Sequence, residues 1–109
     1  MNDHTLMDDI NHILAAPRCG DEAPTLDRVE YALTSGYAQM LALESERWRL
    51  ERRITTLAGA IATEIGGGKV HELAELARDL SVANDHLSEL RGLLESLRVR
   101  RTELATVAP

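Results

Sequence analysis

The sequence predicts an all-α protein built around one long antiparallel helical hairpin, preceded by a short helix. Two leucine-rich segments carry apolar residues at the alternating spacing of three and four that is typical of coiled coils. A run of glycines separates them, as expected for a tight turn between helices. Aromatic residues make up only 3% of the chain and Phe is absent. The apolar content therefore rests largely on Leu and Ala, which are strong helix formers.

Residues 1–24 are predicted to hold a short helix and a loop. Thr5, followed three residues later by Asp8, resembles a capping box at a helix start. Apolar residues then recur on one helical face: Leu6, Ile10, Ile13 and Leu14. Pro17 and the segment 19–24, which is rich in Gly, Pro and acidic residues, end this helix in a loop.

Residues 25–105 are predicted to form the hairpin, with its turn at 65–69 and a tail at 106–109. Thr25 is a suitable N-cap, and Asp27 lies in the first turn, where the helix dipole favours an acid. The first heptad seam consists of Leu26, Val29, Leu33, Gly36, Met40, Leu43, Arg47, Leu50, Ile54, Leu57 and Ile61. The second seam consists of Leu73, Leu76, Leu80, Ala83, Leu87, Leu90, Leu94, Leu97, Arg101 and Leu104. Gly66, Gly67 and Gly68 are expected to stop the first helix.

The charges beside the two seams favour an antiparallel arrangement. With the turn centred near Gly67, residues whose numbers add to about 134 are expected to lie level. The flanking pairs of complementary charge are then Arg53 with Asp79, Glu46 with His86, and Glu44 with Arg91. Exposed pairs of this kind contribute only about 0.2–1 kcal/mol each, so they indicate orientation rather than stability.

Composition and charge exclude several classes of function. The net charge of −6 argues against general binding to nucleic acids or to anionic membranes, which needs a basic surface. No stretch has the roughly 20 apolar residues of a membrane span, and the N-terminus lacks a signal-peptide pattern. The single cysteine, Cys19, cannot form an internal disulfide, so we expect a cytoplasmic protein. The preference for Arg over Lys hints at a bacterial origin.

The first hairpin helix has more apolar surface than one partner helix can cover. Tyr37, Leu41 and Trp48 lie beside its seam, on one side of the helix. Large apolar residues gathered on one face usually mark a contact with another surface. Two interpretations remain open. Either the N-terminal helix or a second copy of the hairpin covers these residues, or they form a docking face for another protein, with Trp48 as its anchor. A homodimeric four-helix bundle satisfies the first interpretation.

No arrangement of residues predicts a catalytic site, a metal site or a cofactor. The run from Gly66 to Lys69 lacks the spacing and the preceding strand of a phosphate-binding loop. His4, Asp8 and His12 share a helix face, but no fourth metal ligand accompanies them, so we expect solvated surface. Two basic clusters, at 47–53 and 98–101, are expected to form salt-bridged surface. Arg47 and Arg101 are the exceptions, because both occupy seam positions, where polar residues often fix the register.

One segment of the second helix resembles a family of actinobacterial helical-hairpin anti-sigma factors. That family carries the signature Glu-x3-Ser-x2-Arg-x3-Gln-x3-Asp, which holds cyclic di-GMP between helices. Ser88 and Arg91 match the signature here, whereas Asn84, Glu95 and Val99 replace its Glu, Gln and Asp. The resemblance implies a small hairpin that sequesters a partner, with Ser88 and Arg91 as candidate ligand-binding residues.

We therefore expect a non-enzymatic protein–protein interaction module. It would be a small regulatory adaptor or a sequestering protein, and it would act as a homodimer that also binds another protein. Two alternatives from other classes remain open. One is a nucleotide-sensing hairpin that uses Ser88 and Arg91, and the other is a purely structural coiled-coil spacer.

Overall fold

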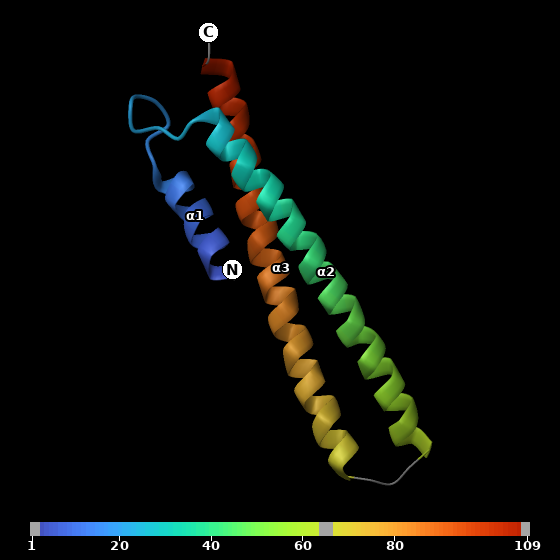
Figure 1. The fold of residues 1–109 in the computed structure, drawn as a ribbon. Helices are drawn as coiled ribbons and strands as arrows, with labels where there is room; N and C mark the ends of the chain where they lie inside the picture. Colours follow the sequence, from blue (N-terminus) through green and yellow to red (C-terminus); the bar gives the residue numbers. More distant parts are fainter. Residues whose placement is uncertain (1–2, 64–66, 108–109) are drawn as a thin grey trace. The chain divides into compact units, whose positions relative to one another are not determined.

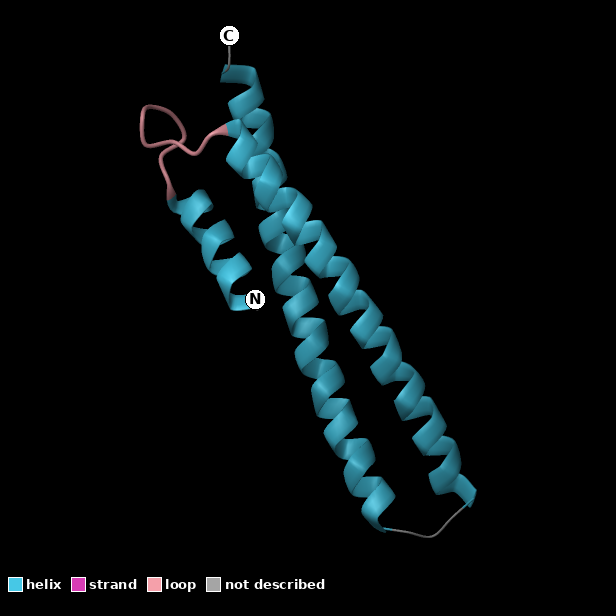
Figure 2. Ribbon diagram, in the orientation of Figure 1, coloured by secondary structure: helices cyan, strands magenta, loops and turns pink. Residues whose placement is uncertain are grey.

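The computed structural model describes residues 3–63 and 67–107, which fold into three α-helices (Figures 1 and 2). Helix α1 spans Asp3–Ala15, α2 spans Leu26–Thr63 and α3 spans Gly67–Val107. No strand is present in these ranges. The predicted fold class is confirmed, since α2 and α3 form the hairpin and a short helix precedes it. No described helix is both long and apolar enough to cross a membrane.

The start of α2 is set by the cap that the sequence predicts. The Thr25 hydroxyl oxygen accepts a hydrogen bond from the backbone N–H of Arg28 at 3.1 Å. The Thr25 carbonyl oxygen also accepts the first helical hydrogen bond, from the N–H of Val29 at 3.1 Å. The hydroxyl thereby satisfies one of the backbone N–H groups that a helix start leaves unpaired.

The turn of the hairpin lies earlier in the chain than predicted. Helix α2 ends at Thr63 and α3 already begins at Gly67, so residues 67–69 of the predicted turn are helical. Residues 64–66 lie outside the described part of the chain, and with them the predicted stop at Gly66. Glycine is costly in a helix interior, but its cost is smaller in the first turn, where the backbone N–H groups have no helical partner in any case. At the other end α3 continues to Val107, past the predicted boundary at 105.

The chain divides into two compact units, which are described separately. Unit 1 comprises residues 1–40 and 89–109, and unit 2 comprises residues 41–88. In unit 1, Gly36 on α2 lies against Leu94 on α3, whose side chain fills the space that a Cβ at position 36 would need. These two residue numbers, 36 and 94, add to 130 and not to the predicted value of about 134. Because the turn precedes Gly67, the register differs from the prediction by about one helical turn.

Unit 1 has a three-helix core because α1 packs onto the hairpin. Ile10 and Ile13 of α1 are completely buried, and so are Val29 on α2 and Leu97 on α3. The other buried apolar residues of this unit are Ala32, Leu33, Leu90 and Leu94. Each fully buried Leu, Ile or Val side chain contributes about 1.5–3 kcal/mol through removal from water. The apolar face predicted for the N-terminal helix is therefore confirmed at Ile10 and Ile13.

Arg100 fastens the end of α1 to α3. Its guanidinium donates hydrogen bonds to the carbonyl oxygens of Ile13 at 3.3 Å, Leu14 at 3.0 Å and Ala16 at 3.3 Å. Only 5% of Arg100 is exposed. The last carbonyl groups of a helix have no donor within the helix and carry partial negative charge. A buried guanidinium both donates hydrogen bonds to them and places a positive charge beside them.

The burial of Arg100 corrects the sequence-based placement of two neighbouring arginines. The sequence placed Arg100 on a salt-bridged surface and Arg101 in the seam, whereas Arg100 is buried and Arg101 is exposed. Two surface ion pairs accompany the Arg100 contact, from Arg28 to Asp9 at 3.0 Å and from Arg18 to Glu103 at 2.8 Å.

Unit 2 has only two helices, and its core is correspondingly incomplete. Four apolar residues are buried there: Leu43, Leu76, Ala83 and Leu87. Other seam residues of this unit are only half-buried, namely Leu50, Ile54, Leu57, Leu73 and Leu80. A residue on a two-helix seam has neighbours on one side only, so a third or fourth helix is needed to remove it fully from water.

Two ion pairs predicted between α2 and α3 in unit 2, those of Arg53 with Asp79 and of Glu46 with His86, are not formed in the described structure. Arg53 pairs with Glu72 at 3.8 Å, which corrects the predicted pair with Asp79. Glu46 and His86 are both exposed and, in the described structure, form no ion pair with each other. The predicted pair of Glu44 and Arg91 joins residues of different units and stays a prediction.

Arg47, at a seam position, is half-buried, and its Nε has no hydrogen-bond partner among the described residues. An unsatisfied buried donor costs about 1–3 kcal/mol. This cost fits the expectation that a polar seam residue is unfavourable for stability.

Candidate interaction surfaces

Two large apolar side chains on α2 of unit 2 are exposed to solvent. Leu41 is 64% exposed and Trp48 is 57% exposed. They are seven positions apart, which corresponds to about two helical turns, so both lie on one face of α2. The guanidinium of Arg52 lies over the indole ring of Trp48, with 4.7 Å from Cζ to the ring centroid. This cation–π contact holds the indole in place and leaves more than half of the residue open to solvent. We call Leu41, Trp48 and Arg52 the tryptophan face.

Tyr37, the third residue of the predicted docking face, belongs to unit 1 and is 38% exposed. It lies nine residues after Arg28, which is about two and a half helical turns and therefore the opposite side of α2. Arg28 forms the ion pair with Asp9 of α1. Helix α1 thus packs on the side of α2 that faces away from Tyr37. The interpretation that the N-terminal helix covers the predicted docking face is wrong for this residue.

The candidate ligand-binding residues of the family signature fall in different units. Ser88 is exposed and belongs to unit 2, whereas Arg91 belongs to unit 1. In unit 1, Arg91 lines a shallow cavity of about 230 Å³ with Tyr37, Met40, Leu94, Glu95 and Arg98. Within it, Arg98 pairs with Glu95 at 3.5 Å. Two guanidinium groups and one aromatic ring therefore line the same hollow.

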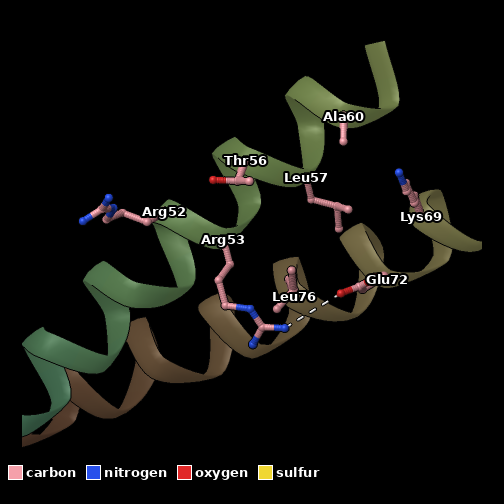
Figure 3. A pocket seen from close by; sticks show the side chains of 8 residues that line it. All are labelled: Arg52, Arg53, Thr56, Leu57, Ala60, Lys69, Glu72 and Leu76. Carbon is pink, nitrogen blue, oxygen red and sulfur yellow. Dashed lines mark ion pairs between the residues drawn. The ribbon is translucent and has the colours of Figure 1, made fainter. Parts of the chain in front are cut away.

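A second groove lies in unit 2 near the turn, between the end of α2 and the start of α3. Its cavity volume is about 350 Å³. The residues that line it are Arg52, Arg53, Thr56, Leu57, Ala60, Lys69, Glu72 and Leu76 (Figure 3). Figure 3 shows Arg53 reaching across to Glu72 on α3, while Arg52 extends away from α3. We call this hollow the turn groove.

The sequence-based predictions missed the role of Arg100, the turn groove and the register of the hairpin. The sequence holds partial signals for the register and for Arg100. Superposing the two heptad seams so that apolar positions coincide pairs Gly36 with Leu94 and Leu43 with Leu87, and each pair of numbers adds to 130. Pairs that add to 137 meet the same criterion, so the position of the turn is still needed to select the observed register. The role of Arg100 has a weaker signal. Arg100 is one position before the predicted seam residue Arg101 and therefore lies beside the seam. The amphipathic N-terminal helix needs a surface to pack against, and the region around Arg100 is one such surface.

The remaining candidate groups stay apart in the described structure. No three His, Cys, Asp or Glu side chains among the described residues lie close enough to hold a metal ion. The side chain of His4, which the sequence places on one helix face with Asp8 and His12, lies outside the described part of the chain. Cys19 is exposed and forms no disulfide. His71 pairs with Glu75 one turn away on α3, at 3.0 Å.

Comparison of the chain with known protein families, with curated proteins and with solved structures found no match.

Proposed function

We propose that this chain is a non-enzymatic protein–protein interaction module that acts as a small regulatory adaptor or sequestering protein in the bacterial cytoplasm. The observation that carries the proposal is the exposure of Leu41 and Trp48 on one face of α2. A tryptophan that is more than half exposed beside an exposed leucine gains substantially from burial, and such residues dominate binding energies at interfaces.

The incomplete core of unit 2 supports the same proposal. Four of its seam leucines, Leu50, Leu57, Leu73 and Leu80, are half-buried because only two helices contribute to the seam. Docking of a partner helix would remove apolar surface both from the tryptophan face and from the flank of the seam.

Self-association is part of the proposal, because a second hairpin would complete a four-helix bundle. Light scattering is expected to give about twice the chain mass of 12.0 kDa. Trp48→Ser is expected to shift the protein toward monomer. Val82→Ser is the matched control, since Val82 is 53% exposed on α3 of the same unit. A wild-type protein that is monomeric at micromolar concentration would contradict the dimer.

Binding of another protein is tested by capture from a native lysate with the full chain. A specific partner is expected with the wild-type protein and with Val82→Ser, and it is expected to be lost with Trp48→Ser. Equal capture by the wild-type protein and both variants would remove the tryptophan face from the proposal.

A nucleotide-sensing hairpin remains the second candidate, and one observation favours it. Arg91, Arg98 and Tyr37 line the same cavity in unit 1. Guanidinium groups bind phosphates in a bidentate manner, and an aromatic ring can stack on a base. The structural-spacer alternative gains no support from the exposed tryptophan, because a spacer needs no apolar side chain in water.

A further inference from the structure

We infer that the turn groove of unit 2 binds an acidic amphipathic helix of a partner protein. This groove shares Arg52 with the tryptophan face, and the inference assigns a chemical class to one partner of the proposed interaction module. Three features of the groove carry the inference: its apolar floor, its local excess of positive charge, and the way in which the same chain already holds a helix of this kind.

The floor of the turn groove is apolar and incompletely covered. Leu57 and Ala60 on α2 are half-buried, whereas Leu76 on α3 is 5% exposed. A partner that presents apolar side chains at helical spacing would cover Leu57 and Ala60 and complete the core near the turn. A polar ligand without such side chains would leave this surface in contact with water.

The rim of the groove is basic, on a chain whose net charge is −6. Three of the residues that line it are cationic, Arg52, Arg53 and Lys69, and only Glu72 is acidic. Arg53 and Glu72 are more than half exposed, and their charged atoms are 3.8 Å apart. Such a pair contributes little, so an incoming carboxylate can take the place of Glu72 at small cost.

Unit 1 shows how this chain recognises a helix of that composition. Helix α1 contains Asp3, Asp8 and Asp9 and no Lys or Arg. Its Ile10 and Ile13 are completely buried, while its Asp9 pairs with Arg28 of α2 at 3.0 Å. Apolar burial flanked by a carboxylate–guanidinium pair is therefore a mode of binding that the hairpin already uses. The turn groove offers the same two elements, and within the described part of unit 2 only α2 and α3 line it.

A small anion is a poorer fit to the groove than a helix. The cationic groups do not converge on one point, since Arg53 reaches toward α3 and Arg52 extends away from it (Figure 3). Charges that remain largely in water bind a small anion weakly. A helix that lies along the groove would shield these charges from solvent and strengthen the attraction.

The test is a fluorescence-anisotropy titration of the full chain with a labelled acidic amphipathic peptide. The peptide has roughly 15 residues, long enough for a marginal helix, with Leu at helical spacing and Glu on the opposite face. We expect binding that weakens at least about fivefold in Arg53→Glu, because one attractive contact becomes repulsive. Arg78→Glu is the matched control, since Arg78 is exposed on α3 of the same unit and does not line the groove.

Two further probes decide between the possible outcomes. A peptide with Lys in place of Glu is expected to bind the wild-type protein more weakly than the acidic peptide does. Millimolar inorganic phosphate is expected to leave the acidic peptide bound. Equal binding of both peptides, equal loss in Arg53→Glu and Arg78→Glu, or displacement by phosphate would each overturn the inference. Circular dichroism of Arg53→Glu checks that the helices persist, and Arg53→Ala serves if they do not. The test depends on Arg53, whereas the proposed adaptor function depends on Trp48, so the two can fail separately.

Discussion

Arg100 provides the sharpest test of the structure, because a buried guanidinium is expected to hold α1 on the hairpin. Replacing it with Met keeps an unbranched apolar stem and removes the three hydrogen bonds to Ile13, Leu14 and Ala16. Arg101→Met is the matched control, since Arg101 is the next residue and is exposed.

The magnitude follows from the contacts that are lost. A hydrogen bond from a charged donor contributes about 1.5–3 kcal/mol net. Two of the three contacts are only partly buried, so water can replace them in part. Favourable interaction of the cation with the end of the α1 dipole adds about 0.3–1 kcal/mol. We expect a total loss of about 3 kcal/mol in the free energy that docks α1. Arg101→Met is expected to change it by less than about 0.5 kcal/mol.

Hydrogen exchange followed by mass spectrometry reads this loss directly. A detached α1 of 13 residues is too short to stay helical in water. A loss of about 3 kcal/mol corresponds to roughly a hundredfold faster exchange of its protected amides. Amides near Leu43 and Leu87 in unit 2 are expected to keep their protection. Unchanged exchange of α1 in Arg100→Met, or equal changes in the two variants, would refute the role assigned to Arg100.

Three further predictions concern the hairpin. Gly36→Ala is expected to destabilise by about 1–3 kcal/mol, because the added methyl group meets an α3 side chain. Gly92→Ala, with open space at its Cβ position, is expected to stabilise by about 0.5–1 kcal/mol, and urea denaturation measures both variants. A change of the same sign in the unfolding free energy of both variants would contradict the packing at Gly36. Leu87→Ala is expected to cost about 2–5 kcal/mol, since Leu87 is fully buried, and Ser45→Ala, on the exposed side of α2, is expected to change little. Cyclic di-GMP at about a hundred micromolar is expected to leave the melting temperature unchanged, and a rise that disappears in Arg91→Ala would place the nucleotide-sensing hairpin first.

Several elements follow from local sequence alone. Thr25 caps α2 as predicted, because capping depends on residues within one turn of each other. Leu87, Leu90, Leu94 and Leu97 are buried as the heptad pattern predicts. The exposure of Leu41 and Trp48 also agrees with their position beside the seam. In each case the periodicity of a helix fixes which face a residue occupies.

The helices, their apolar faces and the hairpin could be predicted because they depend on spacing along one chain. Features that depend on how the helices meet are visible only in the packed fold. The register shifted because helix start and helix interior differ in how well they tolerate glycine, which moved the turn ahead of Gly67. Arg53 pairs with Glu72 and not with Asp79, a choice that the spacing along the chain does not reveal. Arg100 is buried because the end of α1 happens to lie beside it, and the carbonyl groups there need donors that no pattern of nearby residues reveals.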